Sequence, residues 1–412
     1  MAEIRDFNRN QYLLKGGRHK IGKTEGTDRD KKSMDNQLAR HRQIKFYIVL
    51  GVLVFAAAVV FVLYLHWKSM EYTDYVVVQQ TEWIRATDSK SISFGGTLFT
   101  YSNDGMSCTD TKGKMIWNQT YEMQNIIVRT CKKTVAVGDY NGRNIYVANT
   151  QGMLGTINTT VPIRDFCVSS NGVVAAVLDN GTITSICLYN STSGELLVEF
   201  TITMSNSGYP IAIDISSDGS QVAVSYVKAE NGKITSSIGF YNFSSVGKNY
   251  IDNLVSGYGY AGAIVPEVHF MNNDTVFAVA DNRLMFYKGK QKPESVSEIM
   301  ISEEIQSVFY DEGHVGLVFY NTAGGTTYRV EIYDTNAKKV SDIAFDMEYK
   351  EILFASSGII IYNENECILY DWGERLKYQG VFQEAVYCLI PGGGISKHTL
   401  ITDSAIQQIE LQ

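Results

Sequence analysis

Cysteine, histidine and proline are scarce in this chain of 412 residues, which holds six, six and five of them. No two cysteines form a Cys-x-x-Cys or vicinal pair, and each lies within or beside an apolar run. That setting favours small buried side chains over a metal site or a disulfide framework. The few prolines, together with 35 glycines, 26 tyrosines and 18 phenylalanines, favour a β-rich fold with tight hairpins.

The sequence also lacks the motifs of common catalytic and nucleotide-binding sites: it has no Gly-x-Ser-x-Gly, no P-loop and no His-Glu-x-x-His. Residues 257–262 fit Gly-x-Gly-x-x-Gly, but a strand pattern containing Pro266 follows instead of the helix that a dinucleotide site needs. His269, His314 and His398 lie on separate predicted repeats without the spacing of metal ligands. We therefore predict no catalytic residue, no metal site and no cofactor.

The net charge of −8 conceals an asymmetry between the two ends of the chain. Residues 1–45 hold twelve Lys and Arg against six Asp and Glu, a balance of +6. The remainder has 24 basic and 38 acidic residues, a balance of −14. Because phosphate binding draws on clustered Lys and Arg, the acidic body argues against a nucleic-acid partner.

One long apolar run is present. Residues 46–65 carry no charge, and twenty helical residues span about 30 Å, the thickness of a bilayer core. The basic flank lies before the run, so the positive-inside rule predicts a cytoplasmic tail at 1–45, a transmembrane helix at 46–65, a linker at 66–74 and an extracytoplasmic domain at 75–412. The alternative, a cleaved signal peptide, requires a short lead and a small-residue cleavage site, and neither is found. All six cysteines follow the span, where disulfides are possible.

The first 32 residues are polar and are expected to be largely disordered, with a helix beginning at the N-cap candidate Ser33. Within them, Tyr12, Leu13 and Leu14 are a candidate docking motif for a cytoplasmic partner; the alternative is a solvated tail.

A short phrase recurs along residues 75–412, typified by Ile332-Tyr333-Asp334: an apolar residue, an aromatic or small residue, then Asp, Asn or a substitute, with Gly or a substitute shortly after. Its middle positions are 109, 148, 189, 241, 287, 333 and 370. A period near forty with strand-like flanks is typical of a β-propeller. We expect the aromatic residue to pack on the neighbouring blade, the Asp or Asn to bond to the following amides, and the Gly to take a left-handed turn.

The repeats predict an all-β fold, an eight-bladed β-propeller with one N-terminal transmembrane α-helix. The blades are expected to begin near residues 89, 125, 164, 209, 264, 304, 347 and 384. The last unit lacks its outermost strand, and the strand-like run at 75–80 has no repeat phrase behind it. Since an unpaired sheet edge is a hazard, we expect residues 75–80 to close the ring. Seven blades is the alternative if the irregular stretch at 246–263 hides a misjudged boundary.

That stretch also contains a candidate interaction loop with Tyr250, Tyr258 and Tyr260 among Gly and Ser, a composition that binding surfaces use. The alternative is a connector between blades whose tyrosines pack on the ring.

The first unit combines the turn Asp104-Gly105 with Asp110, Gly113 and Trp117, and so resembles a quinoprotein-type propeller repeat, in which Asp-Gly precedes D-x-x-x-G-x-x-x-W. The adjacent cysteines and acidic calcium ligands of quinone-dependent dehydrogenases are not evident in this sequence. The order of a basic tail, one membrane span and a propeller resembles that of an uncharacterised family of single-pass membrane proteins from Gram-positive anaerobic bacteria. This resemblance implies fold and location only.

The leading functional hypothesis is a non-enzymatic scaffold or sensor in the cell envelope, anchored in the cell membrane, with an envelope protein or glycan as partner. The alternative is an extracytoplasmic enzyme, either a hydrolase or a degenerate quinoprotein-type oxidoreductase.

Protease treatment of intact cells tests the predicted orientation. We expect loss of the C-terminal domain and survival of an epitope placed at the N-terminus, because the basic flank retains the tail inside. Loss of the N-terminal epitope with survival of the C-terminal domain would contradict the orientation.

Overall fold

The computed structural model describes residues 26–202, 207–230 and 232–412, which form two units divided between Met70 and Glu71. The first unit contains helix α1 (Gly26–Ser69), and its stretch Arg40–Tyr64 is long and apolar enough to cross a membrane. The helix begins seven residues before the predicted start at Ser33, so the expectation of disorder is wrong for residues 26–32. These residues include Thr and Asp, which favour helix N-termini, and no Pro interrupts them. Residues 66–69, expected in the linker, are also helical.

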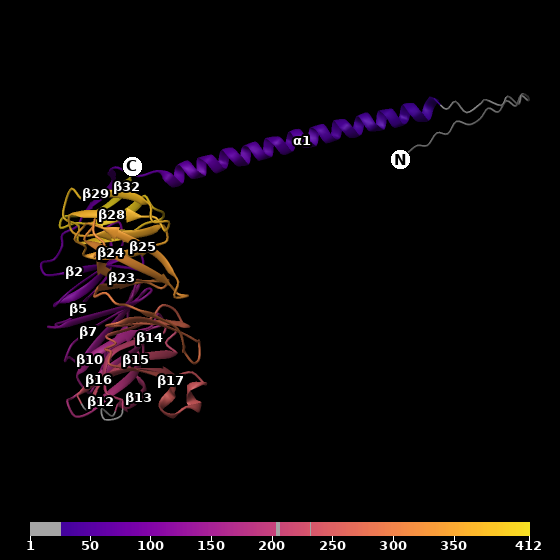
Figure 1. Ribbon diagram of the computed structural model, residues 1–412. Coiled ribbons are helices and arrows are strands. Elements are labelled where there is room, and N and C mark those ends of the chain that lie inside the picture. The colour runs from indigo at the N-terminus through magenta and orange to yellow at the C-terminus, as the bar shows by residue number, and fades with distance from the viewer. Residues whose placement is uncertain (1–25, 203–206, 231) are drawn as a thin grey trace, which may run out of the picture. The chain divides into compact units, whose positions relative to one another are not determined.

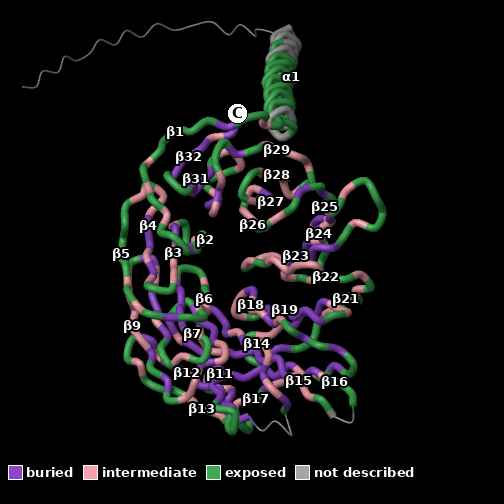
Figure 2. Tube along the Cα trace, turned by 90° about the vertical axis from the view of Figure 1, so that its left-hand side faces the viewer, coloured by how far each residue is buried: buried purple, intermediate pink, exposed green. Residues whose placement is uncertain are grey.

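In the described part of the second unit, the strands form eight four-stranded antiparallel sheets arranged as a ring (Figures 1 and 2). The prediction of an eight-bladed β-propeller is therefore confirmed. Blades one to four, each written from the innermost strand outward, consist of β2 (Lys90–Phe94), β3 (Thr97–Ser102), β4 (Gly105–Thr109) and β5 (Met115–Thr120); β6 (Ile126–Cys131), β7 (Thr134–Asp139), β8 (Asn144–Asn149) and β9 (Gly152–Asn158); β10 (Ile163–Val168), β11 (Val173–Asp179), β12 (Thr184–Asn190) and β13 (Leu196–Ile202); and β14 (Tyr209–Ile215), β15 (Gln221–Glu230), β16 (Lys233–Asn242) and β17 (Leu254–Ala261).

Blades five to eight continue in the same order. They consist of β18 (Glu267–Phe270), β19 (Thr275–Ala280), β20 (Arg283–Lys288) and β21 (Glu294–Met300); β22 (Ile305–Tyr310), β23 (His314–Tyr320), β24 (Tyr328–Asp334) and β25 (Lys339–Phe345); β26 (Glu351–Ala355), β27 (Gly358–Tyr362), β28 (Glu366–Tyr370) and β29 (Leu376–Val381); and β30 (Cys388–Pro391), β31 (Lys397–Ile401), β32 (Ala405–Leu411) and β1 (Tyr75–Glu82).

The predicted blade boundaries lie within four residues of the observed first strands. The stretch at 246–263 contains two 3-10 turns, Gly247–Asn249 and Ile251–Asn253, followed by the regular strand β17. Since β17 is the outermost strand of blade four, the stretch hides no misjudged blade boundary, and the eight sheets exclude the seven-bladed alternative.

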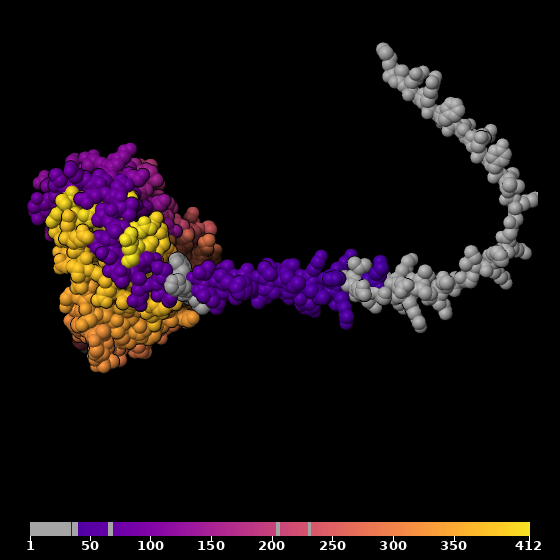
Figure 3. All heavy atoms as spheres, turned by 90° about the horizontal axis from the view of Figure 1, so that it is seen from above, coloured from indigo at the N-terminus to yellow at the C-terminus, as the bar shows by residue number. Residues whose placement is uncertain are grey.

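Strand β1 closes the ring by pairing with the last strand of the chain, as predicted. The antiparallel register runs from Tyr75 opposite Leu411 to Glu82 opposite Ala405, with an irregularity between Val77 and Gln79. Figure 3 shows the first residues of the ring lying among the last ones. The hydroxyl of Tyr75, a buried residue, accepts a hydrogen bond from the Gln383 amide at 2.9 Å. The two ends of this unit are thus joined by backbone pairing and by a buried side chain.

Asp residues of the repeated phrase hold the turn before the outer strand in blades one and six. The Oδ1 atom of Asp110 accepts the amides of Lys112 and Lys114, both at 2.9 Å, and Asp334 accepts those of Asn336 and Lys338 at 2.8 and 3.0 Å. This confirms the predicted hydrogen bonding at these turns.

Glycine takes the left-handed position of the phrase less regularly than the sequence suggests. Gly113 and Gly194 have φ of 84° and 70°, as predicted. In the copy at Asp371 the left-handed residue is Glu374, with φ of 62°, and not the predicted Gly373. Ala337 occupies the position with φ of 59°. A non-glycine residue is tolerated at these two turns because an Asp side chain bonds the loop internally.

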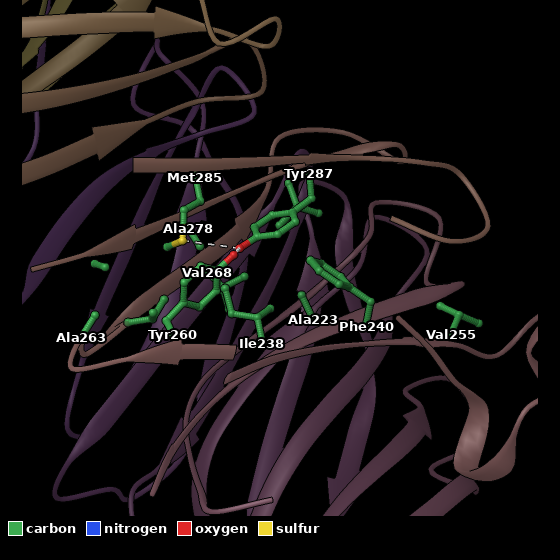
Figure 4. Close-up of a cluster of buried hydrophobic side chains, with 13 residues drawn as sticks. Ala223, Ile238, Phe240, Val255, Tyr260, Ala263, Val268, Ala278, Met285 and Tyr287 are labelled. Atoms are coloured by element: carbon green, nitrogen blue, oxygen red, sulfur yellow. Dashed lines mark hydrogen bonds between the residues drawn. The ribbon is translucent and has the colours of Figure 1, made fainter. Parts of the chain in front are cut away.

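The apolar core lies between neighbouring blades. In Figure 4, Phe240 of blade four packs against Tyr287 of blade five, with ring centroids 5.0 Å apart, and the hydroxyls of Tyr260 and Tyr287 form a hydrogen bond. Tyr241 stacks in the same way on Phe200 of blade three, at 4.6 Å. The aromatic residue of the phrase therefore packs on the preceding blade, as predicted. All six cysteines are free, and five are buried.

Removal of the Tyr75 ring tests the contribution of β1 to stability. We expect Tyr75→Ala to lower the free energy of unfolding by about 3–5 kcal/mol, the usual cost of truncating a buried aromatic residue. Tyr75→Phe should cost about 1 kcal/mol, because it removes only the acceptor for the Gln383 amide. The measurement is urea unfolding of the full-length protein in detergent.

Val78→Ala is the matched control, since Val78 lies on the same strand and is 64% exposed. If Tyr75→Ala is no more destabilising than Val78→Ala, closure by β1 does not support the ring.

Candidate functional site

A cavity of about 620 Å³ lies along the innermost strands of blades two to six. These strands are β6, β10, β14, β18 and β22, and the innermost strands surround the centre of the ring in Figure 2. Charged side chains from five of the eight blades converge in this cavity. Its volume lies in the range of small-molecule sites.

Strand alternation aims polar side chains into this cavity. Asp214 lies between Ile213 and Ile215, which are buried between blades three and four. On the next blade, Glu267 and His269 flank the buried Val268. Because successive side chains of a strand point to opposite faces, packing the apolar residues between blades forces the polar ones toward the channel.

Arg129 and Asp165 form an ion pair in the cavity wall. The guanidinium Nη2 of Arg129, on blade two, lies 2.9 Å from Oδ1 of Asp165, on blade three. Burial raises the pKa of Asp165, and the charge of Arg129 opposes that rise. The pair therefore joins two neighbouring blades, and its two charges balance.

Asp214 and Glu267 lie on either side of the His269 imidazole. Oδ2 of Asp214 is 3.8 Å from Nδ1 of His269, and Oε2 of Glu267 is 4.0 Å from Nε2. The Phe270 amide donates a hydrogen bond to Asp214 at 2.7 Å. Both distances to the imidazole exceed those of a hydrogen bond.

Burial dominates the ionisation of all three groups. It raises the pKa of Asp214 to about 7, although the amides of Phe270 and Ile215 favour the carboxylate, and it raises the pKa of Glu267. Burial, together with nearby Arg129, lowers the pKa of His269 to about 3. The imidazole is therefore neutral at pH 7 and supplies no positive charge to the two carboxylates.

Tyr310 forms an aromatic wall beside this group. Its ring stacks on the His269 imidazole, with centroids 4.1 Å apart and an interplanar angle of 25°, and the residue is 48% exposed. Burial of the hydroxyl, reinforced by the charge of Asp214, raises the pKa of Tyr310, so the phenol stays protonated. One ring face is occupied by His269, and the residue still presents area to solvent.

An ion pair spans the channel. Lys132 follows the innermost strand of blade two and Glu312 follows that of blade six, and their charged atoms are 3.8 Å apart. Blades two and six are opposite each other in a ring of eight, so the pair crosses the cavity. Both side chains are well exposed, and such a pair contributes only about 0–1 kcal/mol.

Two cysteines also belong to the cavity wall. Burial raises the pKa of the Cys131 and Cys167 thiols at the cavity wall, which keeps them protonated and weakly nucleophilic. Among the described residues, no three His, Cys, Asp or Glu side chains are grouped to hold a metal ion.

The site residues predicted from sequence do not converge on this cavity. Tyr250 is half exposed, but Tyr258 and Tyr260 belong to strand β17 and not to a loop. The hydroxyl of Tyr258 accepts the Ser295 amide at 3.1 Å, and Tyr260 is buried against Tyr287. Pairing with β16 and packing on blade five leave Tyr258 partly buried and Tyr260 buried, which fits the alternative that these tyrosines pack on the ring. Their role in an interaction stays a prediction. Tyr12, Leu13 and Leu14 lie outside the described residues.

The residues that line the cavity were missed by sequence reasoning. The charged residues that line it from the innermost strands each occur near a predicted blade start; they are Arg129, Asp165, Asp214 and Glu267. That repeated position is the signal that would have found them.

The ring and its channel define the class of this protein, an eight-bladed β-propeller with a charged, ligand-sized cavity. Residues 68–411 match DUF5711, a family of unknown function, and the chain belongs to this family. No curated protein sequence matches it.

Solved structures resemble the chain at the level of the fold. It is similar to the Dos1 propeller, with 11% identity, a TM-score of 0.50, and coverage of 83% of this chain and 95% of that one. A eukaryotic initiation factor has 12% identity and a TM-score of 0.50, with coverage of 83% and 88%. BamB from Moraxella catarrhalis has 10% identity and a TM-score of 0.46, with coverage of 82% and 100%. Identities this low show the fold alone.

The raised pKa of Asp214 predicts how stability depends on pH. The folded state holds this proton up to about pH 7, whereas the unfolded state releases it near pH 3.8. The carboxyl group therefore lowers the stability of the fold as the pH rises from about 4 to about 7. We expect the stability of Asp214→Asn relative to the wild type to increase over that range and to level off above it.

His269→Gln should show the opposite trend. Because folding lowers the pKa of this imidazole from 6.5 to about 3, the native His269 favours the folded state increasingly as the pH rises over that interval. Urea unfolding at a series of pH values measures both differences. If the difference in free energy of unfolding between Asp214→Asn and the wild type stays constant from pH 4 to 8, the raised pKa of Asp214 is contradicted.

Proposed function

We propose that this protein is a membrane-anchored binding module, a scaffold or sensor whose propeller lies outside the cytoplasm and takes its ligand or partner in the channel cavity. The observation that carries the proposal is the cavity itself. Five blades contribute its lining, and it holds carboxylates whose burial costs free energy when they are ionised and unpaired. A ring that only needed to be stable would gain by apolar residues there, so retention of these groups supports a binding role.

The anchoring is supported by the apolar stretch of α1 and by the charges that flank it. Residues 29–45 hold six Lys and Arg, whereas residues 66–85 hold two, and this difference favours the orientation with the propeller outside. Only Met70 and Glu71 separate the last residue of α1 from Tyr72, whose amide donates to the Lys377 carbonyl at 2.7 Å. The covalent tether between α1 and the first residue bonded to the ring is therefore two residues long.

A second candidate is an extracytoplasmic enzyme, a hydrolase or a degenerate quinoprotein-type oxidoreductase. The contact between Asp214 and His269 favours it, because ionisable groups with shifted pKa values gather at catalytic sites. Metal analysis and an absorbance scan of the purified full-length protein separate the candidates, since a bound metal or quinone would favour the enzyme.

Photo-crosslinking tests the proposed function. We expect a benzophenone amino acid at Tyr310 to form an adduct with an envelope protein, glycan or small molecule in intact cells, because this residue lines the cavity and is exposed. The same substitution at Tyr320 is the matched control, since it lies on the same blade, is 53% exposed and is not part of the cavity lining. Mass spectrometry of the adducts identifies the captured component.

An adduct at position 310 that is missing at position 320 supports a binding role for the cavity. Equal capture at both positions, or none at either, would contradict it.

A further inference from the structure

The charges that line the cavity do not balance. Its two cations are each paired with an anion: Arg129 with Asp165 at 2.9 Å, and Lys132 with Glu312 at 3.8 Å. Asp311, also in the lining, lies 3.1 Å from the His314 imidazole and accepts the amides of Gly313 and His314. Among the described residues, Asp214 and Glu267 have no Lys or Arg within 4.0 Å.

Both carboxylates belong to the cavity lining. They lie near different nitrogen atoms of His269, which is neutral at pH 7. The charge of Arg129 also acts on Asp214, but its guanidinium is paired with Asp165. A positively charged group from outside the chain would therefore meet Asp214 and Glu267 without displacing a protein ion pair. Supplying a counter-charge to partly buried carboxylates is favourable because it replaces the water that burial removed.

The wall beside the carboxylates suits the body of an organic cation. Tyr310, stacked on His269, is half exposed, and a cation over an aromatic face gains further attraction. The cavity of about 620 Å³ is far larger than a metal ion needs. The donor set also lacks three grouped His, Cys, Asp or Glu side chains among the residues described, which disfavours a metal.

We propose that the cavity binds an organic cation, an ammonium- or amidinium-bearing molecule whose charge lies on the cavity side of Asp214 and Glu267 and whose body contacts Tyr310. The proposal deepens the proposed binding function and rests on it. Binding of the cation favours the ionised form of Asp214, so affinity increases as the pH rises from about 5 to 8. The other ionisable groups near Asp214 are Arg129, Cys131, Asp165, Cys167, Glu267, His269 and Tyr310.

The test uses the full-length protein in detergent and two probes of the same shape, benzamidine and benzamide. Isothermal titration should show benzamidine binding at least about tenfold more tightly than neutral benzamide, since hydrogen bonds to charged groups are worth that much. Asp214→Asn and Glu267→Gln should each lower benzamidine affinity by a similar factor. Glu298→Gln is the matched control, because Glu298 is on the same blade as Glu267, pairs with Arg283 and is not part of the cavity lining.

Thermal unfolding of each variant shows whether it is folded, and Asp214→Asn is expected to be at least as stable as the wild type above pH 7. Equal affinity for the two probes, unchanged affinity in both carboxylate variants, or no binding of benzamidine would each overturn the organic-cation assignment. If benzamidine does not bind while the crosslinker at position 310 still captures a component, the binding function stands and the ligand class is wrong. Failure of both experiments overturns both proposals.

Discussion

The backbone pairing between β1 and β32 is the constraint on which the rest of the structure depends. Each blade buries its faces against two neighbours, and the first and last blades have two neighbours only when the ring is closed. Tyr75, from the start of the ring, is buried in one cluster with Leu411 from its end. Closure also determines the channel: the contact between Lys132 and Glu312 exists only because the ring places blades two and six opposite each other.

The channel cavity follows from the same architecture. On the first strands of blades four and five, apolar residues pack between blades, and the polar residues that alternate with them line the channel cavity. Five consecutive blades use those positions for a mixed set of charged and aromatic groups. Arg129 and Asp165 neutralise each other, whereas Asp214 and Glu267 face a neutral imidazole. The lining therefore combines one neutralised ion pair with two carboxylates that lie beside a neutral imidazole.

Most of the fold was predictable from the sequence, and the site was not. The period of the repeated phrase located the blades, because a turn held by an Asp or Asn side chain depends on neighbouring residues and can be recognised in the sequence. The burial of Tyr258 and Tyr260 depends on pairing with β16 and packing on blade five, and these are tertiary contacts. The cavity brings together residues up to 184 positions apart, from Val128 to Glu312. Their proximity depends on ring geometry that spacing along the chain does not encode.

Cysteine crosslinking of the full-length protein tests ring closure most directly. Val76 and Glu410 are register partners in the pairing of β1 with β32, and cysteines at partner positions in antiparallel strands are close enough to form a disulfide. The account predicts that V76C together with E410C forms a bridge within one chain, detected as a linked peptide pair in the monomer. A bridge between two chains, or none under oxidising conditions, would contradict closure of the ring by its own first strand.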